Sequence, residues 1–324
     1  MSRTLQVAVA LLLTALLLYF VVDVREVGQV MAGVHPGWAV ITLFAITCDR
    51  TLMSFKWILL LRARGHRIPI GHALMVYCSA MVWGLALPST VGADAIRAML
   101  IRRRGVAYND SVATIMVERG IGFVSALAMG LLGLLTLRFV LPHAAHYNLL
   151  LLAGAAVMLT AIVVLLLSFT QRAFDFCMSL VPARWRHARP VERLQGLHDT
   201  YRSLAADRRT LVVFALLTFL QQGWMILLSV LIARSLSIDV NELYFVAAAP
   251  LAFLAARLPI SFDGIGIYEG IFVAVMSLAG LSPAQSFSIA LCGRIFNLVT
   301  WLPWFLAFLL RGGSLRREET SAAG

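Results

Sequence analysis

Two stretches of sequence decide the fold, Leu87-Pro-Ser-Thr-Val-Gly-Ala-Asp-Ala-Ile-Arg97 and Leu258-Pro-Ile-Ser-Phe-Asp-Gly-Ile-Gly-Ile-Tyr-Glu269. Both interrupt long apolar runs, both begin with Leu-Pro, and both carry Ser, Gly and Asp. In a membrane, backbone outside a helix needs partners for its N–H and C=O groups, so such breaks occur inside protein or beside a watery cavity. Two breaks in matching positions are typical of transporters built from repeats of opposite topology.

The composition indicates a polytopic membrane protein. Of 324 residues, 60% are hydrophobic and 13% charged, and the mean hydropathy is +0.87, whereas about a quarter of the residues of a soluble domain are charged. The net charge is +11. In a membrane protein an excess of Arg and Lys normally lies in the cytoplasmic loops, so we do not expect nucleic acid as a partner. The four cysteines have neither paired spacing nor a nearby His, so we predict no disulfide, no metal site and no cofactor.

Six apolar runs are long enough to cross a hydrocarbon core of about 30 Å, which takes about 20 helical residues. They fall at roughly 5–22, 37–61, 111–137, 148–168, 210–233 and 284–310. We expect the first to be an uncleaved span rather than a signal peptide, because no small-x-small cleavage site follows it.

Two further runs, 70–87 and 243–258, end in the breaks. If both crossed the membrane, the loop 169–209 with its eight arginines would lie outside. If each run turns at its break and returns, nineteen arginines lie inside and only three lie outside. Positive-inside bias favours the second arrangement. The three outside are Arg25, Arg138 and Arg234.

The sequence therefore predicts an all-α polytopic membrane protein with about six full spans plus two re-entrant helical hairpins in inverted repeats. Both termini are expected in the cytoplasm, and the Arg-rich pattern favours a bacterial inner membrane. The segment 191–207 of the linker is expected to be helical, either against anionic lipid or simply solvated. The expected divisions are a transmembrane domain 1–311, repeat A about 37–137, repeat B about 210–310, the cytoplasmic linker 169–209 and a disordered cytoplasmic tail 312–324.

Ten charged side chains fall within the apolar segments or at their breaks. Each costs about 2.5–3.5 kcal/mol at mid-helix on insertion scales, so they must be paired or hydrated. Sequence neighbours on a helix do not face each other, so we expect each member of the two adjacent acid–base pairs to bind another segment, in one polar network linking the halves. The alternative is that the pairs only lock helix packing. The ten are Asp49, Arg50, Lys56, Asp94, Glu118, Arg119, Arg257, Asp263, Glu269 and Arg294.

The first break is a candidate anion site. Pro88 and Gly92 are expected to stop the helix, and Asp94 is predicted to cap the N-terminus of the returning helix. With Arg97 one turn later, that positive helix end can hold a phosphate oxygen. Ser89 is either part of this site or an ordinary capping residue.

The second break combines flexible backbone with acids. Gly264 and Gly266 permit tight turns, while Asp263 and Glu269 add negative charge. An acid here can pair with a basic headgroup, take up a coupling proton, or neutralise an arginine, and the sequence leaves these open. Nearby polar positions extend the candidate site: Tyr268, Ser261, Arg257, and Arg294 with Asn297, which share a helix face expected to point toward this hairpin.

The candidate substrate-binding residues form one set, with no catalytic or metal-ligating residue among them. Of the mid-span glutamines Gln221 and Gln222, at least one is also expected to point inward. The set is Arg50, Pro88, Ser89, Gly92, Asp94, Arg97, Glu118, Arg119, Arg257, Ser261, Asp263, Gly264, Gly266, Tyr268, Glu269, Arg294 and Asn297.

Over about residues 1–311 the sequence resembles the lysylphosphatidylglycerol synthase transmembrane-domain family, also described as flippase-like. The resemblance lies in Arg50 with Lys56-Trp57, the two break motifs, Glu118-Arg119 and Arg294. It implies movement of modified lipids between leaflets, including aminoacylated phospholipids, with relatives linked to glycolipids and hopanoids. Where the family commonly has Gly-Gly-x-Gly, this chain has Phe262-Asp-Gly-Ile-Gly266, an extra acid that can alter headgroup preference.

The leading hypothesis is a lipid flippase, not an enzyme, whose partners are membrane lipids carrying an anionic, aminoacylated or glycosylated headgroup. Lysylphosphatidylglycerol synthases carry a soluble C-terminal aminoacyl-transferase domain, and this chain ends soon after its last span, so we do not expect aminoacyl transfer. The alternatives are a transferase acting on lipid-linked donors and a non-catalytic scaffold for a separate lipid-biosynthetic enzyme. Against a transferase, the sequence has no Asp-x-Asp metal pair, no His-rich site and no nucleophile motif.

Overall fold

The computed structural model describes residues 3–84, 90–140, 146–180, 189–258 and 260–321. All regular secondary structure in these ranges is helical, as expected. The elements are α1 (Arg3–Phe20), α2 (Val24–Ala32), α3 (Pro36–Ala63), α4 (Ile70–Gly84), α5 (Thr90–Ile101), the 3-10 turn η1 (Arg102–Arg104), α6 (Tyr108–Val140), α7 (His146–Ser168), α8 (Gln171–Ser179), α9 (Arg189–Ala206), α10 (Arg208–Ser235), α11 (Leu243–Ala256), η3 (Phe262–Gly264), α12 (Ile267–Ser277) and α13 (Pro283–Ser321).

Five helices are long and apolar enough to cross a membrane, namely α3, α6, α7, α10 and the Pro283–Leu310 part of α13. They coincide with five of the six predicted spans. The sixth differs: α1 ends at Phe20 and the chain turns by 91° into α2. Asp23 caps α2 by accepting the N–H groups of Arg25 and Glu26, so the polar residues after the first apolar run start a new helix. The apolar run predicted at roughly 5–22 therefore agrees with α1 to within two residues, and α1 meets the length and hydropathy of a span only together with α2.

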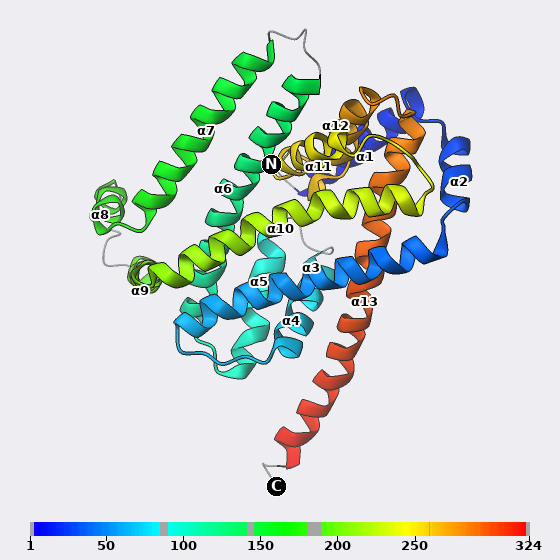
Figure 1. Cartoon of the computed structure of the whole chain (residues 1–324). Coiled ribbons are helices and arrows are strands. Elements are labelled where there is room, and N and C mark those ends of the chain that lie inside the picture. The colour runs from blue at the N-terminus through cyan, green and yellow to red at the C-terminus, as the bar shows by residue number, and fades with distance from the viewer. Residues whose placement is uncertain (1–2, 85–89, 141–145, 181–188, 259, 322–324) are drawn as a thin grey trace.

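Each predicted hairpin is a pair of short helices packed on each other, α4 with α5 and α11 with α12 (Figure 1). The first pair begins and ends at the same end of the molecule, because Arg64 and His66 before α4 bind Asp110 at the start of α6. The second pair does the same: Leu236 and Ile238 before α11 share a buried cluster with Leu281 after α12. Both pairs therefore fold back on themselves.

The two halves pack reciprocally. Helix α3 of the first half lies along α10 of the second (Figure 1), α4 packs on α13, and α11 packs on α6. The first hairpin helix of each half thus contacts the last long helix of the other half. Such an exchange is expected of two repeats related by an axis in the membrane plane, and it places helices of both hairpins at the contact between the halves.

The second break is a tight turn, as its glycines predict. Asp263, Gly264 and Gly266 have φ values of 50°, 69° and 83°, in the left-handed region that L side chains rarely adopt. A Cβ on Gly264 would lie 2.5 Å from the Cβ of Ala256, and one on Gly266 would lie 2.7 Å from the Cβ of Leu13. The turn is therefore closed against α11 on one side and against α1 on the other. The packing of α1 on this break has no signal in the sequence.

The Arg-rich linker is partly helical, as predicted for 191–207. Helix α9 packs on α6 and α10, and its Tyr201 and Leu204 are buried in a cluster with Leu60 and Phe214. The apolar face of α9 is thus covered by protein. Helix α13 continues to Ser321, into the segment 312–324 for which the sequence predicts disorder.

We predict that Gly266→Ala lowers the melting temperature of the detergent-solubilised protein much more than Gly280→Ala. Both glycines have φ of +83°, so both variants carry the same left-handed strain, about 1–2 kcal/mol. Only Gly266 has a neighbour within 4 Å of its Cβ position, and overpacking adds roughly 1–3 kcal/mol. Equal melting temperatures for the two variants would show that the contact with α1 does not form.

Candidate functional site

Arg97 is the centre of the polar residues in the first half. It lies on α5, is 0% exposed, and its guanidinium lies 4.8 Å from the ring centroids of both Trp57 on α3 and Tyr77 on α4. Its Nη2 is 2.9 Å from Glu118 Oε2 on α6, and the Tyr77 hydroxyl donates to Glu118 at 3.3 Å. Four helices therefore meet on this one side chain.

A second ion pair lies beside it. Arg119 donates from Nε and Nη2 to the two carboxylate oxygens of Asp94, at 2.7 and 2.8 Å, a bidentate geometry typical of strong arginine–carboxylate pairs. Helix α5 begins at Thr90, so Asp94 lies inside it, and the prediction that Asp94 is its N-cap is wrong. Arg97 is occupied by Glu118, so it does not stand free at the helix end as the phosphate hypothesis required.

The second half has a corresponding cluster. Arg294 on α13 donates to Glu269 on α12 and lies 3.7 Å from Asp263 Oδ2. The other oxygen of Glu269 accepts the N–H of Gly266 at 2.7 Å, which caps α12. The Arg294 guanidinium also lies 5.9 Å from the ring centroid of Tyr268. Glu269 thus ties the turn, the returning helix and the long helix together.

The two clusters are built alike. In each, an acid near the start of the returning helix pairs with an arginine 25 residues later on the following long helix, Asp94 with Arg119 and Glu269 with Arg294. The same spacing in both halves supports the interpretation of the chain as two repeats, beyond the shared break motif.

Polar contacts also join the halves directly. Gln221 on α10 donates to Asp49 at 2.9 Å and accepts from Lys56 at 2.6 Å, both on α3. Arg50 donates to Asn297 on α13 at 3.2 Å, so Asn297 points to α3 and not to the second hairpin. The contacts described form separate clusters rather than the single network that was expected.

The expectation that sequence neighbours pair elsewhere holds for Glu118 and Arg119 but is incomplete for Asp49 and Arg50. Arg50 Nη2 lies 2.9 Å from Asp49 Oδ2, in addition to their contacts on other helices. A long arginine side chain can bend back along the helix, which Cβ directions alone do not forbid.

Arg257 differs from the other arginines of these clusters. Its Nη1 donates to the backbone carbonyl of Gly122 at 3.0 Å, and its guanidinium packs over Phe253 at 4.7 Å. Among the described residues no carboxylate oxygen lies within 4 Å of it. Gln222, buried on α10, donates to the same carbonyl at 3.4 Å. Arg257 is thus anchored by a neutral group and its charge is not paired.

Arg119 and Lys56 extend this positive region. Arg257 lies within electrostatic range of both, and the Arg119 side chain is 46% exposed although it binds Asp94. Lys56 is bound by the neutral side chains of Thr218 and Gln221. Three cations from α3, α6 and the end of α11 therefore lie near one another, with Asp94 bound to Arg119 and with Glu118 and Asp49 within electrostatic range of Lys56.

Most of the predicted substrate-binding residues take part in the contacts described above, but a few do not. Gly92 lies inside α5, and Ser261 is buried with no partner for its hydroxyl in the described chain. Pro88 and Ser89 lie outside the described residues. Sequence reasoning missed Trp57 and Tyr77 as ligands of Arg97, because an aromatic residue in an apolar run looks like any other core residue.

The sequence matches the family described as lysylphosphatidylglycerol synthase TM region over residues 7–304 of the 324. The chain belongs to this family. Both breaks, both hairpins and all the clusters described above fall within the matched range, and the family indicates a membrane function related to lipids. No curated protein matches the sequence.

We predict that Arg97→Gln destabilises the protein by about 3–5 kcal/mol, because it leaves Glu118 as a buried charge without its partner. The double variant Arg97→Gln/Glu118→Gln is expected to recover part of this loss. Thermal unfolding in detergent measures both.

The matched control is Arg234→Gln, which removes an exposed arginine paired with Glu242 and is expected to cost less than about 1 kcal/mol. If Arg97→Gln proved no worse than this control, the buried pair would not support the fold.

Proposed function

We propose that this protein moves a lipid with a phosphate-bearing headgroup between the two leaflets of the membrane. The observation that carries the proposal is Arg257, a half-buried guanidinium at the second break whose only hydrogen bond among the described residues is to a backbone carbonyl. An unpaired charge at membrane depth costs about 2.5–3.5 kcal/mol on insertion scales. An anionic headgroup that binds Arg257 recovers that cost.

The side chains around Arg257 suit a path along which a lipid headgroup moves better than they suit a closed binding pocket. Arg119, in the other half of the molecule, lies within electrostatic range of Arg257, and its side chain is 46% exposed while it binds Asp94, so a phosphate bound to Arg257 would lie near a second guanidinium. In transporters of this type the substrate sits where the repeats meet, near broken helices. The headgroup would follow these polar side chains while the acyl chains stay in the bilayer.

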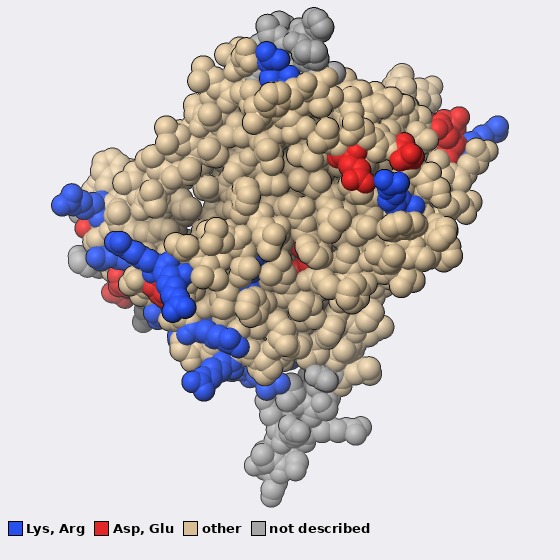
Figure 2. All heavy atoms as spheres, in the orientation of Figure 1, with Lys and Arg blue, Asp and Glu red and all other residues tan. Residues whose placement is uncertain are grey.

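Charge distribution supports an orientation. Figure 2 shows most of the blue surface atoms of this face gathered at the lower left, near α8, α9 and the end of α3, whereas red atoms prevail at the upper right. Positive-inside bias would place the Arg-rich end in the cytoplasm. A bacterial inner membrane is the location we infer from the same pattern.

The acids argue for transport over group transfer. Asp94, Glu118 and Glu269 are each bound to an arginine, so none is free to act as a general base. Asp263 is the partly exposed exception, with 46% of its side chain accessible, and it would have to supply a transferase reaction alone. The contacts therefore favour a binding and moving role.

The test is the leaflet sidedness of fluorescent lipids in proteoliposomes of the purified full-length chain. We expect the native protein to move phosphatidylglycerol, and aminoacylated and glycosylated lipids define its headgroup preference. Arg257→Gln should slow movement roughly ten- to a hundredfold, since a charge-assisted hydrogen bond contributes about 1.5–3 kcal/mol, and Arg257→Lys should retain part of the rate.

The control is Arg234→Gln, with the same change in charge at an exposed site, which should leave the rate unchanged. Equal rates for Arg257→Gln and the native protein would contradict the role of Arg257. Absence of any lipid movement by folded native protein would contradict transport, and formation of a modified lipid from a lipid-linked donor would establish the transferase instead.

A further inference from the structure

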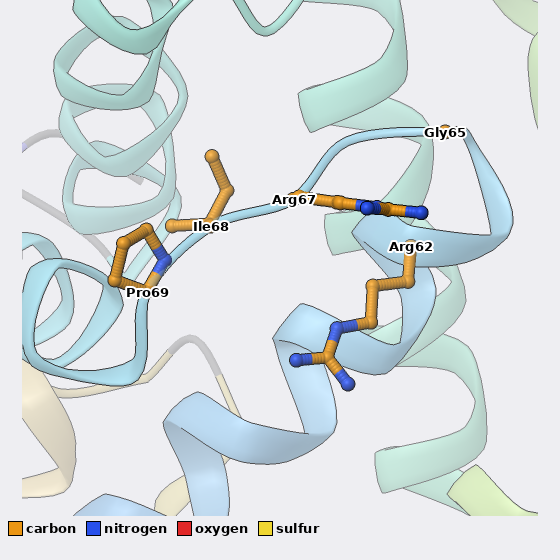
Figure 3. A pocket seen from close by; sticks show the side chains of 5 residues that line it. All are labelled: Arg62, Gly65, Arg67, Ile68 and Pro69. Carbon is orange, nitrogen blue, oxygen red and sulfur yellow. The ribbon is translucent and has the colours of Figure 1, made fainter.

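The loop between α3 and α4 borders an open hollow of about 640 Å³ lined by Arg62, Gly65, Arg67, Ile68 and Pro69. It lies at the Arg-rich end of the molecule, away from Arg257 and the break at α11. Figure 3 shows Arg62, from the last turn of α3, and Arg67, from the loop, both beside the hollow, with their side chains extending in different directions.

Of the four basic side chains in and beside this loop, two bind an acid and two do not. Arg64 and His66 bind the two oxygens of Asp110, at 2.8 and 2.7 Å, and Arg64 also donates to Ser203 on α9 at 2.6 Å. Arg62 and Arg67 are exposed, and in the described part of the chain neither has a carboxylate within 4 Å. One pair holds the loop in place and the other pair is left without an anion.

The loop backbone keeps the two arginines in position. Gly65 has φ of +83° and ends α3, its N–H donating to the Arg62 carbonyl, while the N–H of His66 donates to the Leu61 carbonyl. These bonds satisfy carbonyls that would otherwise repel an anion at a helix C-terminus. On the opposite wall, Pro69 directly precedes α4, whose N-terminal N–H groups favour negative charge.

The position of the hollow, beside the end of a helix long enough to cross a membrane, favours a lipid headgroup as its ligand. It begins where the spanning helix α3 ends, Ile68 is buried beneath it, and the next residue after Pro69 is Ile70, an exposed apolar side chain. Two guanidinium groups suit a phosphate because each can donate two parallel hydrogen bonds to its oxygens.

We propose that Arg62 and Arg67 form a phosphate-binding site at the membrane surface, separate from the region of Arg257, which docks the phosphate of an anionic phospholipid. The site does not depend on transport: it binds at equilibrium whether or not the protein moves the lipid.

Native mass spectrometry of the detergent-solubilised full chain, titrated with phosphatidylglycerol, tests the site. We expect Arg62→Gln/Arg67→Gln to lose one bound phosphatidylglycerol, or to bind it at least about tenfold more weakly, consistent with the loss of two charge-assisted contacts. The matched control is Arg208→Gln/Arg209→Gln, which removes two exposed arginines at the start of α10 and should keep that lipid. Arg62→Lys/Arg67→Lys should restore binding in part.

A second arm uses inorganic phosphate as the probe and distinguishes the source of the phosphate. If only other anionic lipids displace the bound phosphatidylglycerol, the site binds lipid. If inorganic phosphate raises the melting temperature of the native protein and of the Arg208→Gln/Arg209→Gln control but not that of Arg62→Gln/Arg67→Gln, the site binds free phosphate. The proposal would be overturned if Arg62→Gln/Arg67→Gln and Arg208→Gln/Arg209→Gln bound lipid and phosphate equally well. A transport defect in Arg257→Gln with this binding intact would separate the two sites.

Discussion

An ionised side chain in hydrocarbon costs free energy unless another group pairs with it, and the fold of this protein depends on meeting that cost. Arg97 is removed from the lipid by two aromatic rings and neutralised by Glu118. Each returning helix is tied to its following long helix by ion pairs, Arg97–Glu118 and Asp94–Arg119 in the first half and Glu269–Arg294 in the second. The pairs that solve the electrostatic problem are the same ones that hold the hairpins in place.

Since most of the intramembrane charges are used in such pairs, a charged side chain without an ionic partner is a candidate for binding a ligand. Arg257 is anchored by the Gly122 carbonyl, and among the described residues it has no carboxylate partner, which leaves its positive charge unpaired where the halves meet. At the membrane surface the same division recurs: Asp110 neutralises Arg64 and His66, and Arg62 and Arg67 stay open. We propose that both regions bind phosphate, one during the passage of a lipid and one for docking.

Much of the site was predictable because charges in apolar runs are rare and conspicuous. The predicted arginines and acids do meet across helices, and both Gln221 and Gln222 point inward. Their partners were not predictable. Asp94 was expected at a helix cap and instead binds Arg119, because the helix starts one turn earlier, and helix boundaries depend on tertiary contacts that local signals do not contain. Trp57 and Tyr77 looked like core residues until Arg97 was found between them.

The sequence by itself determined that the chain is helical, where the long apolar spans fall, where both break motifs lie along the chain, and which segments carry the positive charge. These follow from hydropathy, from Pro and Gly, and from the bias of arginine, all of which act locally along the chain. Only the tertiary structure decided which charges are paired, because pairing joins residues such as Lys56 and Gln221 that lie 165 positions apart. A cation and an anion have the same sequence signature whether or not they meet. Within the part of the chain that the structure describes, the packing of the two halves leaves Arg257 without a carboxylate partner.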